Sequence, residues 1–475
     1  MAVAAAGPVA GALPAASAPS VLDRFLPEFG GLDPAEKVAR VERLVGPARG
    51  HPSGIPVCMP FVGEDGLREV RAADFDGMDR FRRNFGHELA DPVDFFNNEN
   101  SITTAGSRLA AQSLRRRASG DPAARAGARL AFQGLRRIHD LSVAAGQPGF
   151  LGKPFHFAFS AHTTGDQYLH ALWGLWNFLP VAEPAEQAEA RALLTAMADH
   201  QMKVDYTVFN RSGGAWNNRL DPTDYNAIMA ALVAAAYRVT GERRYREACA
   251  FVLRSGTWQR ESRVDRIISQ VRAGNYRPRA WDGIAGARTE EGEFAHWEQV
   301  QHGQFTAIAA SILHECVPDL LPAEELRRTL RLWWADQPLG FERDGWHYLY
   351  WFLVSARDRS WRPVELTPRL SPDQWLGGHP LLSFASRWVY GDCLARFLWT
   401  ALVVARHCPE LRDEAAAFAE TTFRRLEPRH LLWVADPDGR QIPPAVGYFT
   451  RFVSSELPEV LLAPRWEGRS LGLWS

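Results

Sequence analysis

Carboxylate side chains stand at the start of several strongly apolar segments of this sequence and are its first candidates for catalysis. Asp166 precedes one such run, Asp224 a second and Glu298 a third. A carboxyl group partly buried there holds its proton more tightly and can act as a general acid. Cleavage of a glycosidic bond needs that acid and usually a second carboxylate, at roughly 5 to 9.5 Å depending on stereochemistry. We therefore predict Asp166, Glu298 and Asp224 as catalytic residues.

Side chains suited to a sugar lie around these carboxylates, mostly in stretches rich in Gly, Trp, His and Asn. Indole faces suit the C–H faces of sugar rings, whereas amide, imidazole and guanidinium groups suit hydroxyls. The alternative interpretation is structural, because acidic residues cap helix N-termini and aromatic rings fill a protein interior. The predicted substrate-binding residues are Gln167, His162, Trp216, Asn217, Arg219, His302, Trp281 and Arg387.

Two kinds of segment alternate from about residue 99 onward, and both have helical character. Segments that are apolar on nearly every side require cover on every side; they are 165–179, 224–240, 348–354 and 388–405. Segments with one apolar stripe and one wet face have the 3.6-residue period of an amphipathic helix; they are 123–141, 185–202 and 411–426. This alternation predicts an all-α (α/α)6 barrel, or toroid, of inner and outer helices.

The connections indicate which rim of the barrel carries function. Short turns containing Gly or Pro follow the inner segments, and long loops follow the outer ones, so one rim is plain and the other elaborated. Inner helices are predicted to begin near Glu99, Asp166, Asp224, Glu298, Asp344 and Arg387. Only five outer helices follow, and a helix near 34–44 could complete the ring.

The predicted organisation has four parts. A disordered tail rich in Ala and Pro spans 1–30, and an N-terminal helix with loops spans 31–98. The toroid spans 99–428, and a C-terminal extension at 429–475 packs on it. The segment Leu431–Val434, followed by the turn 436–439, predicts a small β-hairpin in that extension.

The charge balance and the Cys and His content of the sequence limit which partners and cofactors are expected. With 54 basic and 55 acidic residues, the sequence has no excess charge to attract nucleic acid or an anionic membrane. No uninterrupted apolar stretch is long enough to predict a membrane span. The five cysteines are scattered and the histidines lack zinc-site spacing, so neither metal nor cofactor is predicted. We expect a small-molecule or oligosaccharide substrate and a cytoplasmic protein, or an exported one if the N-terminus is a truncated signal peptide; the oligomeric state stays open.

Between Glu99 and Asn177 the sequence is similar to bacterial six-hairpin glycosidase-like proteins, and the likeness in organisation extends to His407, about two-thirds of the chain. The resemblance implies an (α/α)6 toroid whose mouth carboxylates act as acid and base, as in glucoamylase-like enzymes and unsaturated glucuronyl hydrolases, with Asp166 as the best candidate. The resembling motifs are ENS at 99–101, RLAAQSL at 108–114, GDP at 120–122, QPGFL at 147–151, GDQY at 165–168 and ADH at 198–200.

Three functions remain open, because the same toroid also carries sugar epimerases and polysaccharide lyases. The first is a glycoside hydrolase, or related carbohydrate-active enzyme, with Asp166 as general acid. The second is a sugar lyase or isomerase/epimerase that moves protons with His162, His302 and either Tyr168 or Tyr225. The third is a toroid that binds without catalysis.

Overall fold

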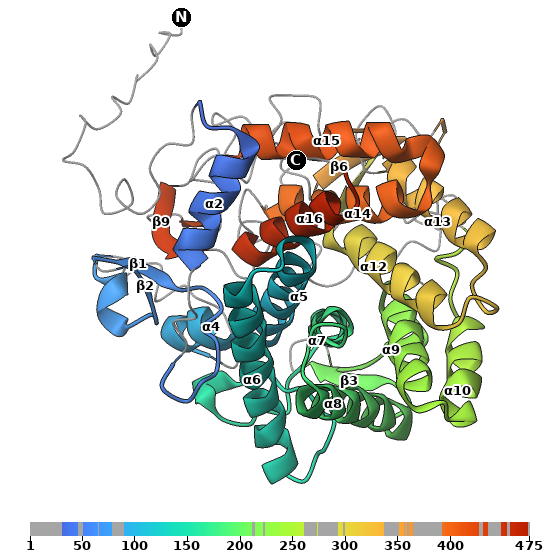
Figure 1. The fold of residues 1–475 in the computed structure, drawn as a ribbon, viewed down its shortest axis with the longest axis horizontal. Helices are drawn as coiled ribbons and strands as arrows, with labels where there is room; N and C mark the ends of the chain where they lie inside the picture. Colours follow the sequence, from blue (N-terminus) through green and yellow to red (C-terminus); the bar gives the residue numbers. More distant parts are fainter. Residues whose placement is uncertain are drawn as a thin grey trace, which may run out of the picture.

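The computed structural model of the protein describes the following residues: 31–45, 51–64, 66–77, 90–210, 214–221, 224–260, 273, 293–297, 300–336, 351–355, 357–358, 361–363, 392–426, 431–435, 448–453 and 457–473. Helices dominate these residues and form two concentric layers (Figure 1). The predicted all-α (α/α)6 toroid is therefore confirmed.

The inner layer consists of helices that are buried on almost every side. In α9, for example, every residue from Asn226 to Ala236 is buried. Consecutive inner helices contact one another, and α16 (Leu457–Ser470) contacts both α14 and α5, which closes the ring. The other inner helices are α5 (Ser101–Ser119), α7 (Gly165–Phe178), α9 (Asp224–Thr240), α12 (Val300–Cys316) and α14 (Asp392–His407).

The outer layer consists of amphipathic helices on the periphery of the molecule in Figure 1. The helix predicted near 34–44 is α2 (Pro34–Val45), which contacts α15 and α16 and so completes the outer layer. Its partner α16 was not among the predicted inner helices. The other outer helices are α6 (Pro122–Ala144), α8 (Pro184–Lys203), α10 (Arg243–Leu253), α13 (Ala323–Asp336) and α15 (Arg412–Arg425).

Local sequence explains the short turns between inner and outer helices. Gly120 follows α5 with a left-handed φ of 71°, a conformation that glycine adopts without strain. Asp121 then accepts a hydrogen bond from the Ala123 N–H at 2.8 Å, and Pro122 opens α6. Glu183 and Glu186 form a reciprocal capping box at the start of α8. Tight caps of this kind let each outer helix double back on its inner partner.

Side-chain contacts show that the inner helices run in the same direction. Asn100 and Gln167, at the starts of α5 and α7, are hydrogen-bonded at 3.3 Å. Near the ends of α7 and α12, the Trp176 indole donates to Glu315 at 2.9 Å. All these helices therefore begin at one rim, which we call the N-terminal rim, and end at the opposite one, the C-terminal rim.

Short strands lie outside the ring. β8 (Leu432–Ala435) and β9 (Tyr448–Val453) pair antiparallel, which confirms the predicted C-terminal hairpin, and they extend a sheet of order β2-β1-β9-β8. The prediction of an inner helix at 348–354 is wrong, because 351–355 form strand β6. The remaining strands are β1 (Phe61–Gly63), β2 (Gly66–Arg68), β3 (Thr207–Asn210), β4 (Gly214–Asn217), β5 (Glu293–Trp297), β6 (Trp351–Ser355) and β7 (Trp361–Pro363).

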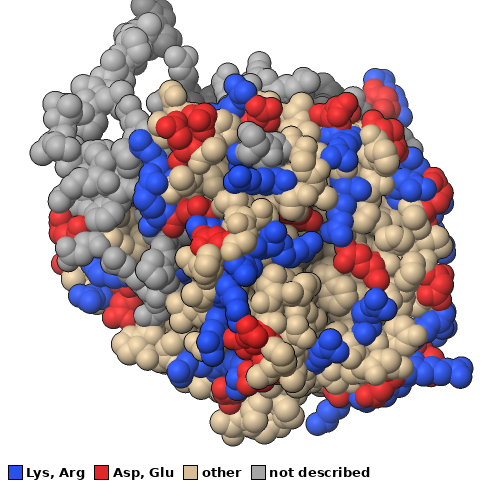
Figure 2. Space-filling view, in the orientation of Figure 1, with Lys and Arg blue, Asp and Glu red and all other residues tan. Residues whose placement is uncertain are grey.

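Four short helical segments complete the described elements: α4 (Pro92–Asn98) and the 3₁₀ turns η1 (Ala72–Phe75), η2 (Phe155–Phe157) and η6 (Pro409–Leu411). Among the described helices, none is long and apolar enough to cross a bilayer. On the face shown in Figure 2, basic and acidic side chains are interspersed over the described residues.

Candidate functional site

Three adjacent inner helices bring polar residues together at the N-terminal rim. Gln167 of α7 donates to the Asn100 side chain of α5, and both residues are buried. On the other side of α7, Gly165 lies so close to the Tyr225 ring of α9 that an added Cβ would be 2.6 Å from it. The first turns of α5, α7 and α9 therefore form one continuous polar wall.

Two of the three predicted catalytic carboxylates lie on this wall. Asp166 is half-buried in the first turn of α7, and its Oδ2 is 3.5 Å from the Gln167 amide nitrogen. Asp224 is fully buried as the first residue of α9. Glu298 lies outside the described residues. The rim thus holds a carboxylate at the start of each of two neighbouring helices, while their roles in catalysis stay predictions.

A lysine–glutamate ion pair adjoins this wall and was not predicted as part of the site. The Lys153 ammonium contacts the Glu99 carboxylate; the two side chains are 5% and 16% exposed. The Lys153 N–H donates to the His162 carbonyl at 2.8 Å, which ties the loop before α7 to this pair. The sequence signal was the rarity of lysine, since Lys153 is one of only three in the chain.

The predicted binding residues of the β3–β4 hairpin and the turn after it have different surroundings. Trp216 packs edge-on against Tyr225, with ring centroids 6.4 Å apart, and so faces the start of α9. Asn217 and Arg219 instead both bind Asp205, and the Arg219 guanidinium also covers the Phe251 ring at 4.6 Å. These contacts hold the hairpin against the ends of α8 and α10.

The remaining predicted residues are only partly placed. His162 is buried, with its ring 6.0 Å from that of Phe155. His302 lies in the first turn of α12, and nothing of its side chain is described. Trp281 and Arg387 lie outside the described residues.

Tyr168, a predicted proton carrier, serves the structure instead. Its side chain is fully buried, and its hydroxyl oxygen accepts a hydrogen bond from the Leu151 N–H at 3.2 Å. Burial raises the pKa of Tyr168 well above its ordinary value, against a smaller opposite effect of the hydrogen bonds from Leu151 and Gln201. A phenol held in this way fixes the loop before α7 and is poorly suited to proton transfer.

A histidine that the sequence reasoning passed over points into the centre of the ring. His170 lies one turn below Asp166 on α7, and its ring contacts Phe305 of α12 and Trp399 of α14, with centroids 5.6 and 6.1 Å away. Neither α12 nor α14 is next to α7 in the ring. These contacts therefore cross the lumen, and only a side chain that projects into it can make them.

The hydrogen bond of His170 fixes its tautomer. Its Nδ1 is 2.8 Å from the backbone carbonyl oxygen of Asp166. Because a carbonyl can only accept, Nδ1 must carry the proton, and in the neutral ring Nε2 then carries the lone pair. The spacing of Asp166 and His170, four residues on an apolar helix, was the available signal.

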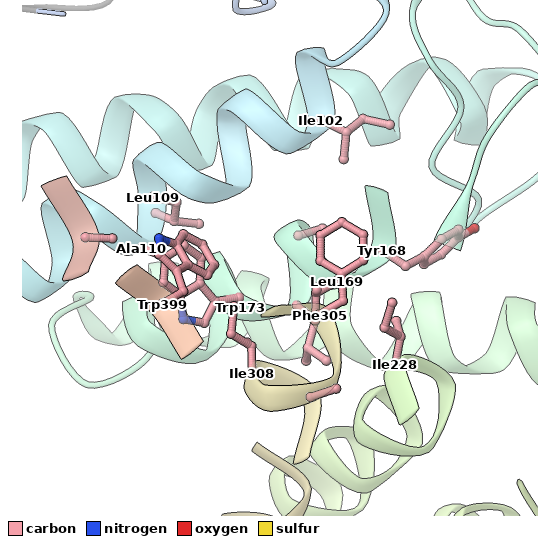
Figure 3. Close-up of a cluster of buried hydrophobic side chains, with 14 of the residues drawn as sticks. Ile102, Leu109, Ala110, Tyr168, Leu169, Trp173, Ile228, Phe305, Ile308 and Trp399 are labelled. Atoms are coloured by element: carbon pink, nitrogen blue, oxygen red, sulfur yellow. The ribbon is translucent and has the colours of Figure 1, made fainter. Parts of the chain in front are cut away.

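Below His170 the lumen is filled by aromatic side chains. The ring centroids of Trp173 and Trp399 lie 3.6 Å apart, and Figure 3 shows these two rings together, with Phe305 beside Leu169. We call Trp173, Phe305 and Trp399 the aromatic layer. His170, which is 1% exposed, contacts two of these rings, Phe305 and Trp399.

Within the described part of the chain, no group of three or more His, Cys, Asp or Glu side chains is arranged to hold a metal ion. The described rim therefore offers carboxylates, an ion pair and an imidazole as its reactive groups. Such groups support proton transfer to and from a polar ligand.

Comparisons with known proteins give a likeness to solved structures only. No family model and no curated protein matches the chain. It resembles cellobiose 2-epimerase from Spirochaeta thermophila DSM 6192 with 15% identity and a TM-score of 0.39, over 78% of this chain and 86% of that one. It resembles D-mannose isomerase with 11% identity and a TM-score of 0.40, over 85% of this chain and 98% of that one. It also resembles cellobiose 2-epimerase from Bacillus thermoamylovorans B4167, with 10% identity and a TM-score of 0.40, over 83% of this chain and 98% of that one. At such values no residue role and no reaction can be transferred to this chain.

Proposed function

We propose that this chain is a carbohydrate-active enzyme that interconverts sugar isomers by proton transfer at the N-terminal rim. The observation that supports the proposal is the position of His170, which projects into the lumen below the rim in a fixed tautomer. This favours the isomerase or epimerase alternative over the glycoside hydrolase that we expected first.

The geometry suits a base better than a pair of carboxylic acids. A neutral imidazole with its lone pair on Nε2 is a general base near neutral pH. A hydrolase instead needs two carboxylates across the bond. Of the carboxylates at the rim, Glu99 is already engaged in an ion pair with Lys153.

The proposed reaction removes a proton from the carbon next to the carbonyl of an open-chain sugar. His170 Nε2 takes the C2 proton, and the electron pair of the C–H bond forms the double bond of an enediolate. Return of a proton to C1, with transfer of the C2 hydroxyl proton to O1, gives the ketose. Protonation of C2 on the opposite face by a second acid, with the electron pair on O1 re-forming the C1 carbonyl, gives the epimer. The aromatic layer would exclude water from the lower side of the sugar.

Incubation with D-glucose, D-mannose, D-fructose and cellobiose in D₂O tests the proposal. We expect conversion between isomers, with solvent deuterium at C2 of an aldose product and at C1 of a ketose product. His170→Asn should lower kcat by about 10²-fold or more, the usual contribution of a general base. His314→Asn is the matched control, because His314 also bonds a backbone carbonyl through Nδ1, at 2.8 Å, but lies near the opposite rim.

The expected result for a hydrolase is different. Oligosaccharides would yield new reducing ends that carry ¹⁸O from labelled water, and Asp166→Asn would abolish this activity while His170→Asn retained it. That pair of results would refute the isomerase proposal and restore Asp166 as the general acid.

A further inference from the structure

The C-terminal rim contains a cavity that the proposed reaction does not use. Its volume is about 330 Å³, and it opens between the last turns of the inner helices. Two residues of the aromatic layer, Trp173 and Trp399, form the floor of this cavity and are 6% and 2% exposed. Its upper wall includes Trp176, Glu315, Arg406 and Glu467.

The polar groups of this wall come from four inner helices. Arg406 of α14 donates to Glu315 of α12 at 2.8 Å and to Glu467 of α16 at 3.3 Å. The Trp176 indole of α7 donates to the second oxygen of Glu315 at 2.9 Å. These bonds fix the direction of each group, so the wall is organised before any ligand arrives.

Accessibility increases from the floor to the opening. The Glu467 side chain is 18% exposed, that of Glu315 28% and that of Arg406 37%. Burial raises the pKa of the Glu467 carboxyl, with a further contribution from Glu315, while Arg406 and Arg117 act in the opposite direction. Charged groups lie at the edge, therefore, and indole faces lie at the bottom.

The charges of the lining residues balance one another. The cavity is lined by two guanidinium groups, Arg117 and Arg406, and two carboxylates, Glu315 and Glu467. A balanced set attracts neither a cation nor an anion strongly. Fixed donors and acceptors above an aromatic floor instead match a molecule with several hydroxyl groups and an apolar C–H face.

We propose that the C-terminal rim is a second binding site, for a small neutral sugar. The volume is at the lower end of the roughly 300–1,000 Å³ typical of small-molecule sites, so a mono- or disaccharide fits and a polymer does not. A purely structural ion-pair network would be packed closed, whereas this one surrounds open space. The inference does not depend on the proposed reaction, because neither His170 nor the rim carboxylates Asp166 and Asp224 line this cavity.

Calorimetric titration of the full chain with D-glucose, D-mannose and cellobiose tests this site. The titrations use the His170→Asn protein, so that turnover does not contribute heat. Glu467→Gln and Trp176→Phe should each weaken binding of at least one of these sugars by tenfold or more. Trp334→Phe is the matched control, since Trp334 makes the same indole-to-glutamate hydrogen bond, to Glu414 at 2.9 Å, on the outer helix α13. It should change affinity less than twofold.

The outcomes separate this inference from the proposed function. Thermal unfolding confirms that each variant is folded, and Trp176→Phe serves as the test if Glu467→Gln is not. Affinities that neither variant changes, or no binding of any of these sugars, would overturn the second site. Binding of choline or inorganic phosphate that Glu467→Gln alters, without binding of neutral sugars, would also overturn it. With His170 present, Glu467→Gln and Trp176→Phe should each change the turnover of the sugar by less than twofold. If the protein shows no turnover of any sugar but these variants still lower sugar affinity tenfold, only the proposed isomerase activity is refuted.

Discussion

The contact between α5 and α7 offers a sharp test of how the fold positions His170. Gly106 of α5 lies directly against the backbone of α7, so that a Cβ at position 106 would be 2.2 Å from the His170 carbonyl oxygen and 2.8 Å from the Ala171 nitrogen. A Cβ added at Gly174, one turn further along α7, would be 2.6 Å from the Gly106 carbonyl oxygen. Substitution of Gly106 by Ala must therefore push α5 and α7 apart at His170, the residue that we propose as the base.

The size of the effect follows from two opposing contributions. Real Cβ contacts do not fall below 3.0 Å, so the carbonyl of His170 would have to move by about 0.8 Å. Overpacking of a core costs about 1–3 kcal/mol, and backbone atoms that cannot rotate away place this case at the upper end. Alanine gains about 1 kcal/mol over glycine within a helix. The net expectation for Gly106→Ala is a loss of about 2 kcal/mol.

Thermal unfolding and kinetics measure the two consequences. For a chain of 475 residues, 2 kcal/mol corresponds to a decrease in Tm of about 2 °C. Because His170 moves with its carbonyl, kcat should fall by about tenfold or more. Gly127→Ala is the control, since a Cβ there meets only the Gln112 side chain at 3.0 Å, which can rotate. If Gly106→Ala proved as stable and active as Gly127→Ala, the close crossing would not position the site.

Three further predictions concern buried polar groups. Tyr168→Phe should cost about 1–3 kcal/mol of stability, because the Leu151 N–H loses its acceptor, with little change in kcat. Lys153→Met should cost about 3–5 kcal/mol in chemical denaturation, because the Glu99 carboxylate loses its buried partner, and Lys153→Arg should restore most of this. Burial lowers the pKa of His407 to about 3, so between about pH 6.5 and this value His407 is protonated in the unfolded chain but not in the folded one. Stability should therefore fall as pH decreases from 6.5 to 4, by up to about 3 kcal/mol, and His407→Gln should reduce this loss.

The helical ring could be predicted because its signal repeats along the sequence. The apolar run 224–240 coincides with α9, and the amphipathic run 185–202 lies within α8. A helix buried on all sides and a helix with one wet face leave different patterns, and each pattern extends over several turns. Because these helical segments are long, their patterns distinguish a helix from a strand.

The two missed elements lacked that signal. The run 348–354 is apolar but short, and a short apolar run fits a buried strand as well as a helix; its residues from 351 onward form β6. α16 lies in the segment 429–475 that was predicted as a C-terminal extension, and it contains Pro464, a residue that normally argues against a helix interior. The packing of α2 on α16 joins segments more than 400 residues apart, which no local pattern encodes.

For the site, the sequence could indicate a rim but not its contacts. Acidic residues at successive helix starts predicted that Asp166 and Asp224 share a rim, because inner helices of a toroid run parallel. The pairing of Lys153 with Glu99 joins residues 54 positions apart and depends on the course of the loop before α7. The four-residue spacing of Asp166 and His170 could place both on one face of a helix, but that His170 reaches across the lumen depends on which helices lie opposite.

Parallel inner helices give the two rims opposite electrostatic character, which Asp166, Asp224 and Arg406 match and the C-terminal carboxylates Glu315 and Glu467 do not. Helix N-termini carry partial positive charge and C-termini partial negative charge. Asp166 and Asp224 accordingly stand in the first turns of α7 and α9, while Arg406 stands in the last turn of α14. The positive end of α7 also favours a negative charge that develops above it, as on an enediolate at the N-terminal rim. At the C-terminal rim the partial negative charge of the helix ends offsets the positive potential around Arg406, whose N–H groups bind Glu315 and Glu467. The same helix direction thus favours charge development at one rim and neutral binding at the other.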